Sequence, residues 1–271
     1  MTAKGLSTAN KQPEIIAVAN QKGGVGKTTT AINLATALAA IKKDVLIIDM
    51  DPQGNASTGL GRERNERECS SYEVIMGEAS LAEAIVDTIV PGLHLVPSTI
   101  DLTGAELELV HQEQRTFRLR RAFRDPVLEN YDYVLIDCPP SLNLLTLNTL
   151  AASHSVIVPL QCEFFALEGL SLLLQTIETV KTNFNPSLEM GGVILTMYDK
   201  RNNLTEQVAI DVRSYLGDVV FDTVIPRNVR VSEAPSHGKP VLLYDLKCSG
   251  SQAYLELASE LLKRHKAKKA A

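Results

Sequence analysis

Short aliphatic runs alternate with longer amphipathic stretches along most of the chain. The runs predict strands at 15–19, 45–49, 93–97, 133–137, 156–159, 192–197 and 219–225. The stretches between them predict helices near 29–40, 81–88, 103–124, 144–152, 167–182 and 206–216. Ser80, with Glu83 three residues later, forms a capping-box pattern at the start of the second of these helices.

Most of the predicted strands are continuous aliphatic runs, as expected when both faces of a sheet are covered by helices. Strands and helices that alternate in this way require parallel strands and right-handed crossovers. No repeat and no Pro-, Gly- or Ser-rich linker divides the chain. We therefore expect an α/β fold, a single doubly wound and mostly parallel sheet, over residues 14–262. A flexible polar tail (1–13) and a basic tail (263–271) would flank it.

The composition excludes several classes of protein. The chain has 271 residues, and no apolar run approaches the roughly 20 residues of a membrane span. No signal peptide pattern opens it, and its four scattered cysteines form no CxxC pair, which indicates reduced thiols in a cytoplasmic protein. The net charge of −5 argues against a strongly basic nucleic-acid binder, so any contact with DNA would need a local basic patch.

The segment KGGVGKTT, at 22–29, directly follows the first predicted strand and opens the first predicted helix. This is the pattern of a phosphate-binding loop. Lys27 is placed to meet the β- and γ-phosphates of a nucleotide, and the hydroxyl of Thr28 to coordinate Mg²⁺. The glycines let successive backbone N–H groups point at an anion, and the helix dipole adds to the attraction. The residues that complete the expected nucleotide site are Gly23, Gly24, Val25, Gly26 and Thr29.

Lys22 gives this loop a second lysine, which the general motif does not require. Its ammonium could fold back on its own nucleotide or reach into the site of a facing subunit. The alternative is a solvated lysine at the mouth of the loop, since most lysines are exposed.

Aspartates follow two further predicted strands at the edge where such sheets bind their ligands. Asp49 ends one aliphatic run and Asp137 ends another, a pattern that holds Mg²⁺ directly or through its water shell. Asp51 is a candidate for orienting the attacking water, because phosphoryl transfer depends mainly on positioning. Either Asp51 or Asp137 could instead be an ordinary turn residue.

Four segments together resemble the ParA-type chromosome and plasmid partition ATPases, a deviant branch of the P-loop proteins. They are KGGVGKTT, DMDPQGN, LIDCPPSLNLLTLN and IPRNVRVSEAPSHGKP, and the resemblance extends from about residue 14 to 262. The branch also includes the septum-site Min ATPases and the nitrogenase iron protein. The phosphate loop and Asp137 are common to the branch, whereas the second and fourth segments are more specific to the partition group.

The resemblance implies a role for each matching residue. Lys22 corresponds to the signature lysine that crosses a dimer interface to the partner's nucleotide, much like an arginine finger. Lys27 corresponds to the phosphate-loop lysine and Asp51 to the acid needed for hydrolysis. The metal site would consist of Thr28, Asp49 and Asp137. Pro226 and Asn228 match positions that help to hold the adenine.

The family binds DNA without sequence preference through basic surface residues late in the chain. The matching candidates are Arg201 and Arg230, with Lys200, Arg227 and Arg213 as weaker additions. Contacts of this kind would be salt-sensitive and blind to sequence. The alternative is that these side chains only solvate the surface.

Two other classes remain as alternatives. A Min-like membrane-cycling ATPase would need an amphipathic C-terminal helix with bulky anchors, but the apolar positions at 254–262 favour packing on the sheet and the basic end has no such anchor. An iron–sulfur protein would need well-placed thiolates, and the candidates Cys138 and Cys162 are better interpreted as packed thiols.

The resemblance thus predicts a slow ATPase switch that uses ATP and Mg²⁺. ATP would close a homodimer, the homodimer would bind double-stranded DNA non-specifically, and hydrolysis would release it. A centromere-binding partition protein would stimulate turnover, and the protein would be cytoplasmic and associated with the nucleoid rather than with a membrane.

Overall fold

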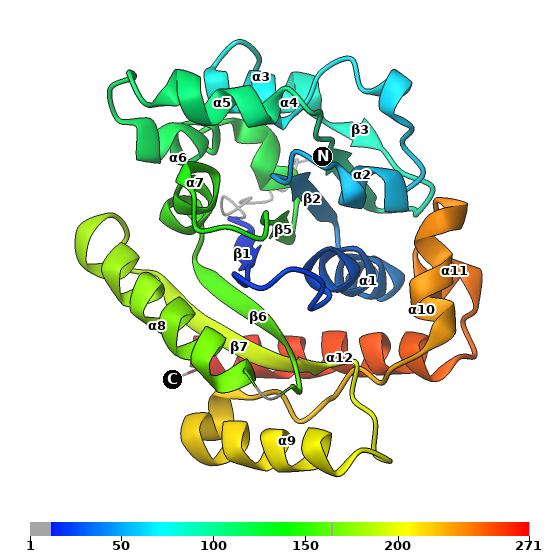
Figure 1. Ribbon diagram of the computed structural model, residues 1–271. Coiled ribbons are helices and arrows are strands. Elements are labelled where there is room, and N and C mark those ends of the chain that lie inside the picture. The colour runs from blue at the N-terminus through cyan, green and yellow to red at the C-terminus, as the bar shows by residue number, and fades with distance from the viewer. Residues whose placement is uncertain (1–11, 164, 271) are drawn as a thin grey trace, which may run out of the picture.

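A seven-stranded sheet lies at the centre of the computed structural model, which describes residues 12–163 and 165–270 (Figure 1). The order across the sheet is β3-β4-β2-β5-β1-β6-β7. The strands are β1 (Glu14–Val18), β2 (Val45–Asp49), β3 (Val86–Asp87), β4 (Leu93–Val96), β5 (Tyr133–Asp137), β6 (Ser155–Gln161) and β7 (Glu189–Thr196). Only the short β3 is antiparallel to its neighbour among these strands. The predicted doubly wound, mostly parallel sheet is confirmed.

Helices cover both faces of this sheet (Figure 1). The first six are α1 (Lys27–Ala40), α2 (Asn55–Gly59), α3 (Ser71–Met76), α4 (Leu81–Ala84), α5 (Leu102–Leu109) and α6 (Arg118–Ala122). The others are α7 (Leu144–Ala152), α8 (Ala166–Asn183), α9 (Asn203–Leu216), α10 (Val229–Glu233), α11 (Val241–Tyr244) and α12 (Ser249–Ala270). No described helix is both long and apolar enough to cross a membrane.

Side chains of the central strands alternate between two buried layers. On β5, Leu135 points into the cluster built by α1 and α12, whereas Val134 points into a second cluster on the opposite face. Both are fully buried, which explains why the strands read as unbroken aliphatic runs. Because the strands are parallel, their carboxyl ends meet at one edge, where the segment after β1 opens into α1.

The C-terminal helix α12 belongs to the core. Tyr254, Leu257 and Leu261 are buried in the same cluster as the apolar face of α1, which confirms that the apolar positions at 254–262 pack inside the molecule. The helix continues through the basic residues as far as Ala270. Most of the expected N-terminal tail, residues 1–11, lies outside the described residues.

Two of the predicted helices are wrong in extent. The stretch 103–124 is split into α5, a 3-10 turn and α6, because Gln114 has a positive φ of 52° and the chain turns there. Leu109 and Leu119 thereby reach the same apolar cluster. The stretch 81–88 ends as a helix at Ala84 and continues as β3, although its capping box of Ser80 and Glu83 is confirmed.

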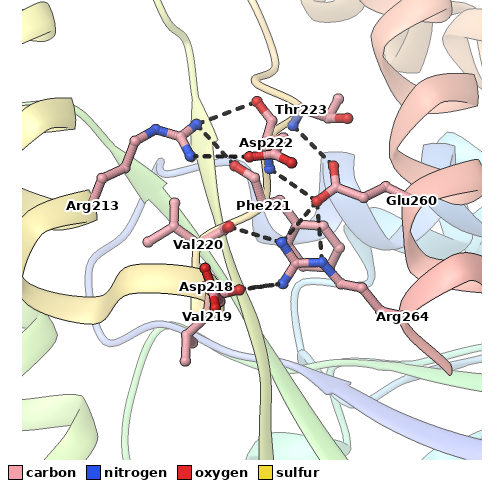
Figure 2. Close-up of polar contacts among 9 residues, drawn as sticks. All are labelled: Arg213, Asp218, Val219, Val220, Phe221, Asp222, Thr223, Glu260 and Arg264. Atoms are coloured by element: carbon pink, nitrogen blue, oxygen red, sulfur yellow. Dashed lines mark hydrogen bonds and ion pairs between the residues drawn. The ribbon is translucent and has the colours of Figure 1, made fainter. Parts of the chain in front are cut away.

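The predicted strand at 219–225 is also wrong. The segment runs beside β7 but forms only isolated bridges, because side chains of other elements take its backbone groups (Figure 2). Arg264 of α12 donates to the carbonyl oxygens of residues 218–220, at 2.8–3.4 Å. Arg213 of α9 donates to the carbonyl oxygen of Phe221 at 2.9 Å.

Glu260 of α12 also binds this segment, and we call the contacts of Arg213, Glu260 and Arg264 with residues 218–223 the clamp (Figure 2). Its carboxylate accepts the backbone N–H groups of Asp222 and Thr223, both at 2.9 Å, and pairs with Arg264 at 2.8 Å. The Arg264 guanidinium also lies 4.2 Å from the centre of the Phe221 ring. The N–H groups of Phe221 and Ile225 still donate to carbonyl oxygens of β7, at 2.9 and 2.8 Å. Side chains satisfy several of the other backbone groups of the segment, so no continuous ladder forms.

Candidate active site

The loop between β1 and α1 has the shape that phosphate binding requires. Gly24 and Gly26 have positive φ angles of 74° and 91°, which side chains with a Cβ rarely adopt. Thr196, at the end of β7, donates its hydroxyl to the carbonyl oxygen of Val25 at 2.8 Å. Asn20 accepts the backbone N–H of Lys22 at 3.0 Å. The loop is thus held from inside the protein, and its curvature does not depend on a ligand.

Lys27 is the first residue of α1, and its side chain returns to the loop. Its ammonium donates to the carbonyl oxygen of Lys22 at 3.0 Å, and the residue is only 6% exposed. Burial lowers the pKa of Lys27, while the negative charges of Asp137 and Asp51 oppose that shift. A buried ammonium beside a helix N-terminus is well placed to attract a phosphate.

Asp137 lies at the end of β5, fully buried beside Lys27. Neither of its carboxylate oxygens has a partner with full hydrogen-bond geometry among the described residues. Burial and the nearby Asp49 raise the pKa of Asp137, whereas the hydroxyl of Thr28 and the charge of Lys27 lower it. A buried carboxylate with unused oxygens, next to a threonine hydroxyl, fits the oxygen ligands that Mg²⁺ prefers.

Asp49 is the register partner of Asp137 on the neighbouring strand, but its oxygens are occupied. One oxygen accepts the backbone N–H and the hydroxyl of Ser57, at 2.9 and 2.7 Å. The other accepts the backbone N–H of Asp51 at 3.2 Å. Burial raises the pKa of Asp49 to about 6. Of the two predicted metal aspartates, Asp137 is therefore the more available, and Asp49 organises the loop that follows β2.

Asp51 is placed in that loop and is 6% exposed. Its Oδ1 atom accepts the backbone N–H of Gln53 at 3.0 Å. This oxygen therefore stabilises the turn, as expected for an ordinary turn aspartate. Its Oδ2 atom takes no hydrogen bond from a described residue. The charge of Asp51 also acts on Lys27, which places it beside the phosphate loop.

The residues that hold this loop in place were missed by sequence reasoning. Arg67 donates to the carbonyl oxygen of Ser98 at 2.8 Å and to the hydroxyl of Thr58 at 2.8 Å. Its guanidinium lies so close to Gly54, which has a φ of 64°, that a Cβ there would be 2.1 Å from Nη1. Ser98 in turn donates to the carbonyl oxygen of Asp51 at 2.7 Å. None of these partners shares a motif with another, so no local signal identifies them.

The Lys22 side chain points away from Lys27. Its ammonium forms an ion pair with Glu163, which follows β6, and the two side chains are 44% and 46% exposed. The exposed Phe165 lies two residues further along the chain. The two lysines of the loop are therefore separated. Lys27 faces the interior of its own site and Lys22 faces the surface.

The segment with Pro226 and Asn228 reaches the same edge of the sheet through β7. Tyr198, two residues after the threonine that holds the phosphate loop, exchanges backbone hydrogen bonds with this segment at 2.9 and 3.0 Å. Asn228 caps α10 by accepting the backbone N–H of Arg230 at 2.8 Å. Pro226 lines a hollow of about 720 Å³ together with Tyr198 and Arg227.

Comparison with known proteins identifies the family. A family model described as an AAA domain matches residues 13–190. The chromosome partitioning protein ParA of Caulobacter vibrioides is 61% identical over 258 residues, which cover 94% of this chain and 96% of that protein. The sporulation initiation inhibitor protein Soj of Bacillus subtilis is 54% identical over 248 residues, covering 92% and 98%. The chain belongs to the ParA-type partition ATPases.

A solved structure agrees with the fold of this ParA-type chain. Cobyrinic acid a,c-diamide synthase from Mycobacterium smegmatis, with a bound ATP analogue and magnesium, has a TM-score of 0.83 at 38% identity. The match covers 94% of this chain and 97% of that one. The synthase is less similar in sequence to this chain than the two partition relatives are. Its structure therefore supports the fold, whereas the partition relatives establish the family.

Three of the basic residues that the ParA resemblance assigns to DNA lie near one another at the surface. Lys200, Arg201 and Arg227 line the same hollow as Pro226. Arg201 makes a two-pronged contact with Asp199, at 2.9 and 2.8 Å, which lowers the pKa of Asp199 to about 2. Arg213 is different, because its guanidinium holds the clamped segment.

Arg230 of this ParA-type chain is paired in a similar way. Its guanidinium lies 2.9 Å from Glu233 and 3.7 Å from Asp245. Both leading DNA candidates are thus exposed, and both are engaged by carboxylates of their own chain.

The thiols considered for a metal cluster are buried. Cys138 and Cys162 belong to one apolar cluster, and burial raises the pKa of both, that of Cys162 to about 11. Raised thiol pKa values disfavour the thiolate form that cluster ligation requires.

Proposed function

We propose that this chain is an ATP-dependent switch in chromosome or plasmid partition. The observation that carries the proposal is the unsatisfied, buried Asp137 carboxylate beside Lys27 and Thr28, at the open N-terminus of α1. A nucleoside triphosphate with Mg²⁺ would satisfy these groups together. Two of the similar curated proteins are named chromosome partitioning proteins, and these names indicate the process in which the switch would act.

Each group of the site would have a distinct task. The backbone N–H groups of residues 23–29 and the Lys27 ammonium would bind the phosphates. Thr28 and Asp137 would hold Mg²⁺, with Asp49 supporting them, and the bound ion would neutralise phosphate charge. The free oxygen of Asp51 would orient the attacking water. Pro226 and Asn228 would contact the base.

Lys22 would act in a second copy of this chain. Its side chain points outward, and among the described residues it is restrained by the weak, exposed ion pair with Glu163. In a homodimer the ammonium would leave Glu163 and bind the phosphates of the nucleotide in the facing subunit. That exchange would make dimer formation depend on ATP.

DNA would bind to the dimer through Arg201 and Arg230, assisted by Lys200 and Arg227. A monomer of net charge −5 attracts DNA weakly, and dimerisation doubles the number of these side chains on one assembly. ATP would thereby control association with the nucleoid. A centromere-binding partner would accelerate hydrolysis, which would otherwise be slow, well below the ~1–100 s⁻¹ of kinases.

A DNA-retention assay tests the proposal directly. The protein is passed over immobilised DNA of unrelated sequences with ATP, with ADP and without nucleotide. Retention with ATP alone, equal for all sequences and falling steeply with salt, is expected. Retention without nucleotide, selection of one sequence, or co-sedimentation with anionic vesicles in place of DNA would refute the proposed switch.

A further inference from the structure

Five arginines lie within ten residues around α6. The segment from Arg115 to Arg124 reads RTFRLRRAFR and contains no acidic residue, in a chain whose net charge is −5. Arg120, Arg121 and Arg124 are exposed, and none of the three side chains makes an ion pair or hydrogen bond with another described residue. This concentration of unpaired positive charge is not used by the proposed ATPase cycle.

Two hollows whose walls combine apolar and charged side chains adjoin these arginines. The first, of about 480 Å³, lies between α6 and the segment from α3 to α4, and Arg118 and Arg121 line it with Val74, Leu81 and Ala122. The second, of about 490 Å³, is lined by Arg120 and Arg124 with the apolar side chains of Phe123 and Leu128 and with the exposed Glu129. Asp125 and Pro126 line both hollows, so the two are neighbours.

Hydrogen bonds from Arg118 to α3 hold the wall of the first hollow in place. Arg118 donates to the carbonyl oxygen of Ile75 at 3.0 Å and also to that of Met76, at the end of α3. Gly77, with a φ of 80°, leaves room for this guanidinium, since a Cβ there would be 2.8 Å from Nη2. The carbonyl groups at the end of α3 are thus occupied, and the hollow keeps its shape without a ligand.

The acidic groups that line the hollows, Asp125 and Glu129, are fewer than the five arginines. Asp125 accepts the backbone N–H of Val127 at 3.0 Å and that of Ala82 at 3.1 Å, so each carboxylate oxygen has a backbone donor. Glu129 lies at the second hollow, but no ion pair joins it to a described arginine. The surface therefore combines net positive charge with apolar recesses.

We propose that Arg115–Arg124 and the two hollows, here called the α6 surface, bind an acidic protein segment. Carboxylates of the segment would pair with Arg120, Arg121 and Arg124, and its apolar side chains would enter the hollows. Carboxylates match the guanidinium fork well. A DNA backbone offers phosphates but no apolar side chains for the recesses, and a basic peptide is repelled by the arginines.

The α6 surface is separate from the proposed DNA contacts. Figure 1 places α6 beside α5 and α7, whereas α9 and α10 lie at the bottom and right of the view. An acidic partner could therefore be held by a protein that is also on DNA.

Fluorescence anisotropy with the full-length protein tests the proposal. The probe is a labelled peptide in which glutamates flank a pair of leucines, compared with a glutamate-only peptide, a labelled DNA duplex and anionic phosphatidylserine vesicles. The glutamate–leucine peptide is expected to bind best. R120Q/R121Q/R124Q should weaken it by about tenfold, as expected for three exposed ion pairs. Ala79→Trp, which narrows the first hollow without a change of charge, should also weaken it.

The control changes the same charge elsewhere. K42Q/K263Q/K266Q alters three exposed lysines outside the α6 surface and should leave peptide binding unchanged. ATP turnover and thermal unfolding of each variant check that it folds. Equal loss in the lysine variant, or equal binding of the glutamate-only peptide, would overturn the proposal. Tighter binding of DNA or vesicles that disappears in the arginine variant would assign the surface to that ligand instead.

Discussion

The nucleotide site and the proposed DNA surface place their charges in opposite ways. In the nucleotide site, Lys27 and Asp137 are buried and face each other across elements far apart in the sequence. On the proposed DNA surface, Arg201 and Arg230 are exposed and each pairs with a carboxylate two or three residues away. The first arrangement depends on the fold, whereas the second depends on local sequence.

This difference indicates how each region would work. A buried charge has few alternatives to its intended ligand, so the loss of one group should be severe. An exposed arginine exchanges one carboxylate or phosphate for another at little cost, so the surface would act through the number of contacts. Mutations should therefore have large effects in the first region and graded effects in the second.

Lys27→Ala should have the largest effect. It removes the buried ammonium that would meet the phosphates, so ATP affinity should fall by at least about hundredfold, and turnover, dimerisation and DNA retention with it. Calorimetric titration with ATP measures this. Lys263→Ala, at an exposed position on α12, is the control and should bind ATP normally. Near-normal affinity in Lys27→Ala would disprove the assignment of the loop.

Asp51→Asn should separate chemistry from structure. Asparagine can still accept the backbone N–H of Gln53, so the turn is kept while the charge near the attacking water is lost. We expect ATP binding within a few-fold of normal and turnover lowered by about hundredfold. A phosphate-release assay decides the matter, and unchanged turnover would leave Asp51 as a turn residue only.

Lys22→Ala should still bind ATP, because Lys27 and the loop amides remain in the same chain. The ATP-dependent dimer should weaken by about tenfold or more, since a charge-assisted contact across the interface is lost. Light scattering with ATP measures the dimer. Glu163→Gln releases Lys22 from its own-chain partner and should strengthen the dimer. A normal dimer in Lys22→Ala would disprove a role across the interface.

Asp137→Asn should stabilise the nucleotide-free protein above neutral pH. The folded-state pKa values of Asp137 and Asp49 are raised above the ordinary 3.8, that of Asp49 to about 6, so folding favours their protonated forms. The unfolding free energy of the wild type therefore falls as pH rises from about 4 through 6. The variant should unfold a few degrees higher at pH 8 but not at pH 4. Thermal unfolding at both values checks this, and an equal gain at both would contradict it.

Asp199→Asn and Glu233→Gln should have the smallest effects. Each removes a carboxylate that competes with DNA phosphates for an arginine, so DNA retention with ATP should rise about twofold to fivefold. The opposite substitution, Arg201→Glu, should lower retention on every sequence alike. A salt titration on immobilised DNA measures both. No change in any of these variants would place the DNA surface elsewhere.

The parts of the site that share a motif could be predicted from the sequence. The phosphate loop and the aspartates at the ends of β2 and β5 were found because parallel strands bring their carboxyl ends to one edge. Their supports could not be predicted. Thr196 and Val25 are 171 residues apart, and Arg67 and Ser98 are 31 residues apart, so only the folded chain shows that they meet.

The fold likewise has features that the sequence predicts and features that depend on long-range contacts. Long buried strands and helices were found because their hydrophobic period is unmistakable. The stretch 219–225 looks like a strand because its side chains are apolar, but backbone pairing is decided by Arg213, Glu260 and Arg264 from other helices. Similarly, nothing local indicates that Gln114 adopts a positive φ and divides the stretch 103–124.

The clamp on residues 218–223 also bears on how the chain is made. Its two α12 side chains, Glu260 and Arg264, lie 37 to 46 residues after the groups that they bind, so they are made later. Until they emerge, the carbonyl groups of residues 218–220 and the N–H groups of Asp222 and Thr223 lack these partners. The hydrogen bonds of Phe221 and Ile225 to β7, the last strand in the sheet order, do not depend on α12. Before α12 is made, the segment along the β7 edge is therefore only partly held, and this edge is more open to pairing with other chains. A stalled or truncated product that lacks α12 should aggregate, even though every residue of its nucleotide site has been made.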